Sequence, residues 1–465
     1  MDLIRDNTMS FDPGKEMPDM MRQLVNKLEH LKPVQVIILG FLMVIIAGTL
    51  LLMLPFSSRG AGSAGFADSL FTAVSAVCVT GLVVQDTATF WSTFGQAVIL
   101  TLIQVGGLGV FTVAIALALV SGKKIGLIQR NIMQESISAP QISGIVKFTR
   151  FILETTFVCE GIGAAVMMPV FIRRFGAGKG IWYAVFHSVS AFCNAGFDLM
   201  GESGKYGSLT HFAANPLINI TIMTLIIVGG IGFLTWMDVA INGFHVKRFR
   251  LQSKVILTMT MTLILVPAIY FYFGEFTEGP AGERVLLSFF QSVTPRTAGF
   301  NTADLTKMSE TGIFVLIILM LIGGSPASTA GGMKTTTAAV LLASAAAVFR
   351  QRKDAEIFGR RIPLDAIRSA GAILLLYTML FALGGMAISR IEGLPLLDCL
   401  FETASAIGTV GLTMGITPGL SLVSRGILTF LMYFGRVGGL TLIFATVSEK
   451  GMNNGRLPEE RITVG

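Results

Sequence analysis

Long apolar runs separated by short polar connections dominate the sequence. A membrane-spanning helix needs about 20 predominantly apolar residues, and eight runs come close to or exceed that length. They cover approximately residues 34–54, 94–120, 151–172, 217–239, 256–273, 313–348, 367–388 and 427–447. The sixth run is too long for one crossing and is interrupted by polar residues. The pattern therefore predicts an all-α membrane protein with eight transmembrane helices.

A second, shorter pattern occurs four times between these runs. In each copy a glycine stands ten residues after a phenylalanine, in the pairs Phe71 and Gly81, Phe186 and Gly196, Phe289 and Gly299, and Phe401 and Gly411. The glycines are 115, 103 and 112 residues apart. The surrounding stretches read SAVCVTGL at 75–82, SAFCNAGF at 190–197, TPRTAGF at 294–300 and SAIGTVGL at 405–412. A repeat of this length indicates four similar structural units.

The apolar stretch before each glycine is too short to cross a membrane. Residues 66–77, in the first copy, are only about a dozen. We therefore expect four re-entrant pore helices and loops, in four tandem span–pore helix–span repeats around a pseudo-four-fold pore. The expected divisions are a cytoplasmic amphipathic segment at 1–32, repeats at 33–122, 123–244, 245–350 and 351–450, and a cytoplasmic tail at 451–465.

The loops that end at the four glycines are the candidate ion-binding site. Irregular backbone survives at membrane depth only where it is buried in protein or lines a water-filled cavity. Glycine permits conformations that aim carbonyls inward, and rings of carbonyls replace the hydration shell of a monovalent cation. The expected selectivity-filter residues are Val79, Thr80 and Gly81; Asn194, Ala195 and Gly196; Thr297, Ala298 and Gly299; and Thr409, Val410 and Gly411.

The charged residues indicate the orientation of the chain. Only 14% of the residues are charged, and 23 of the 35 Lys and Arg residues lie in alternate connections and at the two ends. The positive-inside rule then places both termini in the cytoplasm of a multi-pass protein of the cell membrane, inner or plasma. The net charge of +7 therefore reflects topology rather than a nucleic-acid partner. Docking of an acidic partner on the basic connections remains an alternative.

The interruption in the sixth run is the candidate gate. Residues 323–334 read GGSPASTAGGMK, a stretch that a smooth helix cannot accommodate. We expect an intramembrane loop beneath the filter. Arg436, the charged residue of the eighth run, is expected to bond loop carbonyls or hydroxyls. The expected gate residues are Gly323, Gly324, Ser325, Ser328, Thr329, Gly331, Gly332, Lys334 and Arg436.

Several motifs resemble one known family. They are QVGGLG at 104–109, FHSVSAFCNAGF at 186–197, VTPRTAGFNT at 293–302, GSPASTAGGMK at 324–334, TASAIGTVGLTMG at 403–415 and FGRVGGLT at 434–441. From about residue 33 to the C-terminus the chain resembles the membrane subunits of the Trk/Ktr/HKT cation-transporter superfamily. The short segment before the first apolar run fits the KtrB/KtrD type better than the larger Trk type.

This resemblance implies potassium uptake, with K⁺ as the transported ion at the filter carbonyls. It also implies a homodimer on a cytoplasmic RCK-type regulatory ring, similar to KtrA or KtrC, that binds nucleotide. The chain itself carries no phosphate-binding loop, so no cofactor is expected in it and any nucleotide effect must come from the partner. A glycine in all four loops matches the potassium-selective pattern, whereas a serine in the first loop is associated with sodium transport.

Two features of the loops leave questions open. The third loop is one residue shorter than the others and contains Arg296, which we expect to point away from the ion path and bond backbone carbonyls or a carboxylate. Asp86, Asp198 and Asp304 follow three of the loops. They would either draw cations to the outer mouth or serve as local caps and turn residues.

Two other functional classes were weighed. An alternating-access cation symporter would bind its substrate at the midplane between broken helices, and four parallel repeats favour the channel-like alternative. An enzyme is not supported, because the four histidines form no ligand pattern and no nucleophile–base pair is visible in the sequence. The sequence leaves open whether sodium is coupled to transport, activates it or is irrelevant.

Overall fold

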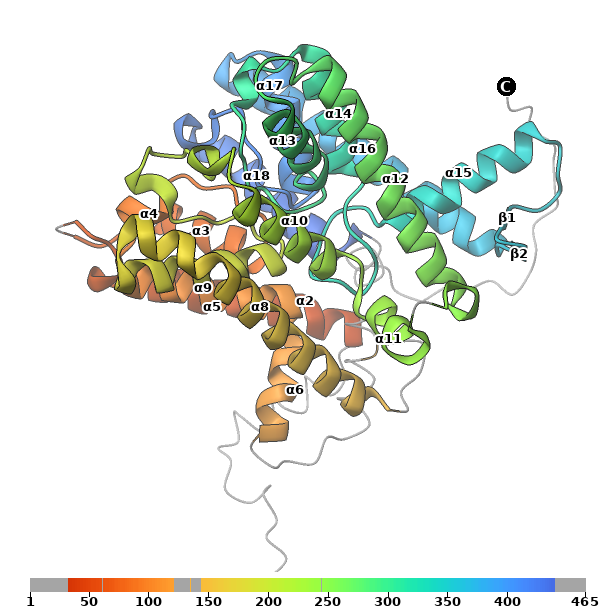
Figure 1. The fold of residues 1–465 in the computed structure, drawn as a ribbon, viewed down its shortest axis with the longest axis horizontal. Coiled ribbons are helices and arrows are strands. Elements are labelled where there is room, and N and C mark those ends of the chain that lie inside the picture. The colour runs from red at the N-terminus through yellow and green to blue at the C-terminus, as the bar shows by residue number, and fades with distance from the viewer. Residues whose placement is uncertain (1–31, 61, 121–133, 135–143, 244, 440–465) are drawn as a thin grey trace, which may run out of the picture.

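The computed structural model describes residues 32–60, 62–120, 134, 144–243 and 245–439, and over these residues the chain is mostly helical (Figure 1). Four successive stretches each contain a first long helix, a shorter pore helix that ends in a loop, and a second helix, which is broken in the first three stretches. The predicted all-α architecture of span–pore helix–span repeats is therefore confirmed. The predicted N-terminal amphipathic segment and C-terminal tail lie outside the described residues.

The first helix of each unit is long and apolar enough to cross a membrane. These helices are α2 (Pro33–Leu52), α8 (Ile145–Phe175), α12 (Leu251–Gly274) and α16 (Leu364–Glu392), with mean hydropathies of 2.6, 1.7, 2.0 and 2.0. Large apolar side chains are exposed on them, among them Met43 at 70% and Phe273 at 72%. Such a surface would aggregate in water, so it indicates contact with lipid.

The second helices differ from the uniform spans that the sequence suggested. The first is α5 (Thr93–Leu108) and α6 (Val110–Val120), and the next is α10 (Pro216–Gly230) and α11 (Phe233–Asn242), which bend by 96°. The breaks fall at Gly109 and Gly232, whose φ angles of 88° and 92° end a right-handed helix. Helix α18 (Leu422–Val437) ends at Gly438 with a φ of 93°. The equivalent helix of the third unit is interrupted by the longer loop between α14 (Glu310–Leu321) and α15 (Thr335–Phe349).

Four pore helices lie inside the ring of long helices. They are α3 (Phe66–Val77), α9 (Ala177–Phe192), α13 (Ala281–Val293) and α17 (Leu396–Ile407). Each second helix packs against the pore helix of the next unit, in the pairs α5 with α9, α10 with α13, α14 with α17, and α18 with α3. The last pair joins the fourth unit to the first. The units therefore form a closed ring, as the four-fold repeat in the sequence predicted.

The second helices begin at matching N-caps, which explains why they start where they do. The side-chain oxygens of Ser92, Asn215, Ser309 and Ser421 each accept a hydrogen bond from the backbone N–H three residues later. Such caps satisfy a donor that the first helical turn leaves unpaired. Short elements fill the connections: α4 (Thr87–Phe90), η1 (Pro55–Ser57), η2 (Met200–Glu202), η3 (Thr210–Phe212), η4 (Val246–Arg248), η5 (Leu305–Lys307) and η6 (Thr417–Gly419).

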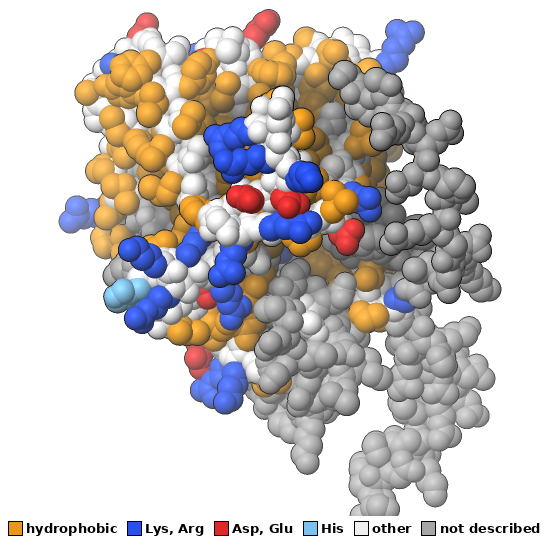
Figure 2. Space-filling view, turned by 90° about the vertical axis from the view of Figure 1, so that its right-hand side faces the viewer, with side chains coloured by type: hydrophobic (Ala, Val, Ile, Leu, Met, Phe, Trp, Pro, Cys, Tyr) orange, Lys and Arg blue, Asp and Glu red, His pale blue; other side chains and the backbone are white. Residues whose placement is uncertain are grey.

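A charged connection links α15 to α16 at one end of the molecule. It contains a small hairpin of β1 (Glu356–Ile357) and β2 (Arg360–Arg361). Arg361 pairs with Asp354 at 2.9 Å, and Arg352 pairs with Glu356 at 3.7 Å. Figure 2 shows Lys and Arg side chains gathered around acidic ones on this side of the molecule, beside a broad apolar surface. This is the end at which the sequence predicted a basic connection.

Candidate functional site

Each candidate filter loop leaves its pore helix through left-handed backbone. Val79, Asn194, Thr297 and Thr409 have φ angles of 56°, 57°, 72° and 50°. The glycine two residues after each of them also has a positive φ. Positive φ is uncommon for residues other than glycine. Its recurrence at four matching places shows that the surrounding structure holds all four loops in one strained form.

A buried hydroxyl group at the end of each pore helix supports the loop that follows. The Ser75 and Ser405 hydroxyl oxygens accept hydrogen bonds from the backbone N–H groups of Gly81 and Gly411, at 3.1 and 3.0 Å. The Ser190 and Thr294 hydroxyls instead donate to the backbone carbonyls of Phe197 and Phe300, at 2.7 and 2.6 Å. Each bond ties the start of a loop to its end, so the intervening carbonyls are fixed.

The four loops meet in a closed ring. A side chain added at Gly81 would overlap the carbonyl of Ala195, and one at Gly196 would overlap that of Ala298. In the same order, Gly299 lies against the carbonyl of Val410, and Gly411 against that of Thr80. Each glycine thus touches the next loop, and the fourth touches the first. All twelve predicted filter residues are buried and are brought together in this ring.

The inner end of the ring has oxygen atoms without a protein partner. Among the described residues, the hydroxyl oxygens of Thr297 and Thr409 are buried and make no hydrogen bond. Buried polar groups are normally paired, so these oxygens call for an explanation. The pore helices also direct their C-terminal, partly negative ends toward the loops. This donor set, carbonyls with added hydroxyls, suits a dehydrated monovalent cation.

The third loop differs from the others, as its length predicted, but Arg296 does not make the predicted contacts. The Ala298 N–H bonds to the Thr294 carbonyl, four residues back, whereas the corresponding bonds of the other loops span five residues. Arg296 is buried and points to α12, where it donates to the Thr260 hydroxyl at 3.3 Å. The expected carbonyl or carboxylate partner was wrong. Helix carbonyls on α12 are already used within the helix, so a hydroxyl is the acceptor that remains.

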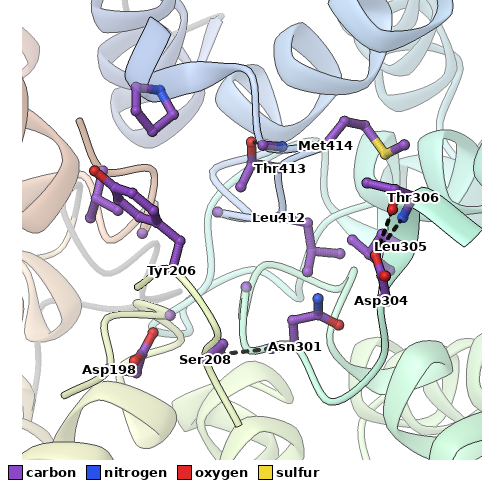
Figure 3. Close-up of a pocket in the computed structure, with 17 residues that line it drawn as sticks. Asp198, Tyr206, Ser208, Asn301, Asp304, Leu305, Thr306, Leu412, Thr413 and Met414 are labelled. Atoms are coloured by element: carbon purple, nitrogen blue, oxygen red, sulfur yellow. Dashed lines mark hydrogen bonds between the residues drawn. The ribbon is translucent and has the colours of Figure 1, made fainter. Parts of the chain in front are cut away.

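A cavity of about 230 Å³ lies directly outside the ring (Figure 3). All four loop glycines line it, together with polar side chains from three units, among them Asp198, Ser208, Asn301 and Thr413. The Ser208 hydroxyl accepts a hydrogen bond from the Asn301 N–H at 3.1 Å, which joins the second unit to the third. The cavity is one mouth of the ring, the one expected to face outward.

The three aspartates near the mouth have different roles. Asp86 caps α4 through the Thr89 N–H at 2.8 Å and also accepts from the Tyr206 N–H at 3.1 Å, so it is a structural cap. Asp304 lines the mouth and caps η5, and hydrogen bonds from Thr306 hold the pKa of its carboxyl below the usual range. Asp198 lines the mouth and accepts from the Met200 N–H at 2.9 Å. Burial raises the pKa of Asp198 to about 7.

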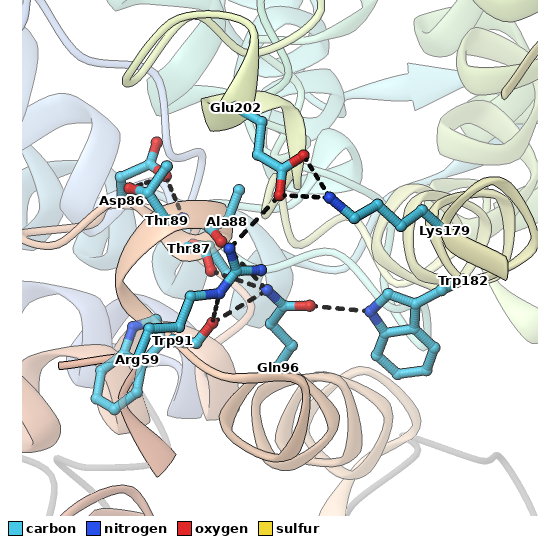
Figure 4. Close-up of polar contacts among 10 residues, drawn as sticks. All are labelled: Arg59, Asp86, Thr87, Ala88, Thr89, Trp91, Gln96, Lys179, Trp182 and Glu202. Atoms are coloured by element: carbon cyan, nitrogen blue, oxygen red, sulfur yellow. Dashed lines mark hydrogen bonds and ion pairs between the residues drawn. The ribbon is translucent and has the colours of Figure 1, made fainter. Parts of the chain in front are cut away.

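A polar network on the outer side holds the first two units together (Figure 4). Glu202 pairs with Lys179 at 3.0 Å and with Arg59 at 3.4 Å, and the hydrogen bond from Lys179 lowers the pKa of its carboxyl. Beneath it, the Trp182 indole N–H donates to the Gln96 Oε1 at 2.9 Å. These contacts join α9 and η2 of the second unit to α5 and to the segment before α3 of the first unit.

The stretch from Ile322 to Lys334 forms a loop inside the ring of helices. The N–H groups of Ser325 and Thr329 donate to the carbonyls of Gly230 and Gly229, at 3.0 and 3.2 Å. The Thr329 hydroxyl donates to the carbonyl of Phe192, the last residue of pore helix α9, at 3.0 Å. A side chain at Gly331 would overlap the Thr409 hydroxyl of the fourth filter loop. The loop therefore lies directly beneath the ring of candidate filter loops.

Small residues let this loop fold back on itself. A side chain at Gly323 would overlap the Gly331 carbonyl, and one at Gly324 would overlap the Ala330 side chain. Gly332 donates its N–H to the Gly435 carbonyl of α18 at 3.2 Å. The Ser325 and Ser328 hydroxyls bond within the segment, to the Thr335 hydroxyl and the Ser325 carbonyl. They are therefore not partners of Arg436, although loop hydroxyls were among its expected acceptors.

Arg436 joins three units beneath the filter. Its guanidinium donates to the carbonyl of Thr329 in the loop and to the carbonyls of Gly106 and Gly107 at the end of α5. A helix C-terminus attracts positive charge, so this end of α5 is a favourable site for the cation. Lys334 also turns inward, where its Nζ donates to the carbonyls of Ala330 and Gly331 at 2.8 and 3.3 Å.

A second cavity of about 300 Å³ lies on the other side of the loop from the filter. Loop residues Ala327, Ser328, Ala330 and Gly332 line it, as do Lys334 and Arg436. The loop and its two cations thus lie between the filter and this inner cavity. All nine predicted gate residues belong to this loop or contact it.

Sequence reasoning missed a row of polar residues on the pore helices. Thr72, His187, Gln291 and Glu402 each stand three residues before the hydroxyl residue that begins a filter loop. All four are buried, and the last three bond the chain just after the filter. The constant offset within the repeat was the signal that could have found them.

Comparison with known proteins places this geometry in context. The family model described as TrkH, cation transport protein, matches residues 8–456. The chain is 41% identical over 457 residues to the potassium/sodium uptake protein NtpJ of Enterococcus hirae, covering 96% of this chain and 100% of that protein. It is 38% identical over 452 residues to the Ktr system potassium uptake protein B of Bacillus subtilis, covering 96% and 100%.

A solved structure has a similar fold. The potassium transporter TrkH from Vibrio parahaemolyticus matches with a TM-score of 0.68 over 88% of this chain and 84% of that one, at 19% sequence identity. At that identity the likeness concerns the fold.

Proposed function

Because the chain belongs to the Trk/Ktr family of cation transport proteins, as a membrane subunit, we propose that it forms a channel-like pathway for potassium uptake. Like its relatives, it is a multi-pass membrane transport protein and not an enzyme. The observation that carries the proposal is the closed ring in which each loop glycine touches the carbonyl of the next loop. The relatives named as potassium uptake proteins support the same ion.

Potassium passes through the ring by exchanging its water for protein oxygens. The carbonyls of Thr80, Ala195, Ala298 and Val410 supply one layer, and the hydroxyls of Thr297 and Thr409 supply donors at its inner end. These carbonyls are held by left-handed backbone and by the hydroxyl bonds behind the loops, so they do not collapse onto a smaller ion. Partly negative pore-helix ends favour the cation in the ring.

The intramembrane loop closes the pathway at rest. It lies between the filter and the inner cavity, and Arg436 and Lys334 hold it through backbone carbonyls. Opening requires the loop to leave the Thr409 side of the filter. The contact between Arg436 and Thr329 is the bond that must break or move.

The proposal includes partners and orientation. The subunit works as a homodimer with both termini in the cytoplasm of the cell membrane, on a nucleotide-binding cytoplasmic ring. The basic connection that contains β1 and β2 supports this, because Lys and Arg gather there beside the apolar surface (Figure 2). The ring would act on α15, which runs from Lys334 toward this connection.

The closed four-loop ring favours this proposal over alternating access. A symporter with a midplane site requires two halves that rock against each other, whereas here each unit packs on the next around one axis. The family resemblance leaves the role of sodium to experiment, and the name of the Enterococcus relative includes both ions.

The test is ion-competition flux in proteoliposomes that contain the purified chain with its regulatory ring. Potassium or rubidium uptake should saturate and should resist competition by excess sodium outside. Equal inhibition by sodium and potassium would contradict a potassium-selective filter. Sodium added inside or outside at fixed potassium then separates coupling from activation.

A further inference from the structure

The four pore helices carry a polar residue at one matching position, and its surroundings differ between units. Thr72, His187, Gln291 and Glu402 are each 1% exposed or less. Each precedes the hydroxyl residue of its own loop by three positions, which is nearly one helical turn. The residues therefore face the same way from each pore helix, toward the chain that leaves the filter.

In the second and third units this side chain bonds the segment just outside the filter. The His187 Nε2 accepts a hydrogen bond from the Leu199 N–H at 3.3 Å, three residues after Gly196. The Gln291 Nε2 donates to the Asn301 Oδ1 at 2.9 Å, two residues after Gly299. Each bond links the rigid pore helix to the outer end of its filter loop.

In the fourth unit the same link is made by a buried carboxylate with three donors. The Glu402 Oε1 accepts from the Thr413 hydroxyl at 2.5 Å and from the Met414 N–H at 3.0 Å. Its Oε2 accepts from the Thr417 hydroxyl at 2.6 Å. Thr413 and Met414 follow the filter glycine Gly411 by two and three residues, and both line the outer mouth (Figure 3).

The first unit has no equivalent bond. The Thr72 hydroxyl has no partner among the described residues, and the chain after Gly81 presents Val83 and Val84 instead of polar side chains. There Gln85 bonds Asp68, on the first turn of the pore helix, at 2.9 Å. Thr72 is therefore a natural reference for the same position without the link.

We propose that Glu402 is a positioning residue for ion selectivity, which fixes the outer end of the fourth filter loop through Thr413, Met414 and Thr417. This inference rests on the proposed potassium filter. Without the carboxylate, three donors in the segment after Gly411 lose the rigid acceptor that they share. The Val410 and Gly411 carbonyls then move more freely. A looser ring accommodates the smaller sodium ion better, so discrimination falls while conduction persists.

The experiment measures potassium KM, maximal rate and the inhibition constant of sodium in proteoliposomes with the regulatory ring. Glu402→Ala should lower the potassium-over-sodium preference about tenfold, as removal of a residue that orients ion ligands commonly does. Glu402→Gln should stay near wild type, because its oxygen still accepts from the Met414 N–H and its amide can donate to the threonine hydroxyls, which accept as well as donate. Thr72→Val is the matched control, and it should change nothing.

Thr413→Val provides a second variant, which breaks one of the three bonds from the loop side and leaves Glu402 in place. It should shift selectivity in the same direction as Glu402→Ala, but less. The inference is overturned if both variants transport with wild-type selectivity, or if Thr72→Val shifts it equally. Gly411→Ser separates the two claims. If it alters selectivity and the Glu402 variants do not, only this inference fails, whereas if it also leaves selectivity unchanged, the filter itself is wrongly assigned.

Discussion

The guanidinium of Arg436 donates to the backbone carbonyl of Thr329, although the two residues are 107 positions apart. Through the same group α18 is also tied to Gly106 and Gly107, at the end of α5. One side chain thus joins the loop of the third unit to the fourth and the first units. Because its acceptors are backbone carbonyls, the contact depends on the position of the loop and not on the identity of its side chains.

Arg436→Ala should raise basal potassium flux and weaken its dependence on the regulatory ring. Hydrogen bonds to a charged group contribute roughly 1.5–3 kcal/mol each. Arg436 makes one such bond to the loop, so its loss would shift the closed state by roughly 1.5–3 kcal/mol, about ten- to a hundredfold in open probability. Deletion of residues 325–331 should act in the same direction. The measurement is rubidium flux from proteoliposomes with and without the ring.

Thr329→Val is the matched control for this gate prediction. It removes the hydroxyl that bonds Phe192 but leaves the backbone carbonyl that Arg436 uses. Its basal flux should therefore rise less than that of Arg436→Ala. If Arg436→Ala and the deletion both fold and transport with unchanged basal flux and regulation, the loop is packing and not a gate.

Nucleotide control should require the partner ring. The chain carries no phosphate-binding loop, so ATP and ADP should alter flux only when the ring subunit is present. Co-purification and flux with each nucleotide, with and without the ring, check this. Full nucleotide-regulated flux from the membrane subunit by itself would contradict it.

Potassium affinity should fall as the outside pH drops through about 7. Burial raises the pKa of Asp198 to about 7, so its carboxylate is charged above that pH and neutral below it. Asp304, whose pKa is lowered by Thr306, keeps its charge over this range. A charge at the mouth is worth about 1 kcal/mol in a water-like dielectric, which predicts roughly a fivefold rise in KM between pH 8 and 6.

Asp198→Asn should give the high KM at every pH and remove this dependence. Asp86 contributes to the raised pKa of Asp198, so Asp86→Asn should shift the midpoint downward without abolishing it. A KM that is independent of pH in the wild type, or a dependence that persists in Asp198→Asn, would exclude Asp198 as the titrating group.

Ser421→Ala should destabilise the fold by about 1 kcal/mol, because it removes the N-cap of α18. The same hydroxyl also donates to Glu392 at the end of α16, so the substitution removes one of three hydrogen bonds that join Glu392 to the start of α18. Thr429→Val, on the same helix, is the control, since that hydroxyl bonds only a carbonyl one turn back. Melting midpoints in detergent should fall for the first variant and hold for the second.

The four glycine loops could be located from the sequence because they depend on local features. The ten-residue spacing from phenylalanine to glycine identified loops that the structure gathers into one ring, and the polar insert at 323–334 identified the intramembrane loop. Both signals lie within a short stretch of chain. The helix breaks at Gly109 and Gly232 were harder to predict from the sequence, because an apolar run with glycines also fits an unbroken helix that packs closely against its neighbours.

Contacts between distant segments could not be predicted in the same way. Arg296 bonds Thr260, 36 residues earlier, because α12, which carries Thr260, packs against α13, which ends just before Arg296. Glu402 accepts hydrogen bonds from Thr413, Met414 and Thr417. These residues follow it in the sequence but contact it only because the filter loop turns back. Partners of this kind are set by the packing of whole units.

The claim that four glycine loops form one potassium filter is tested most directly by the relative potassium and sodium affinity of Gly81→Ser. A side chain at Gly81 meets the Ala195 carbonyl of the next loop, whereas Gly161, on α8, has nothing within 4 Å and provides Gly161→Ser as the control. In proteoliposomes with the regulatory ring, Gly81→Ser should let sodium compete about tenfold better, while Gly161→Ser should match the wild type. An unchanged potassium preference in folded Gly81→Ser would contradict the filter.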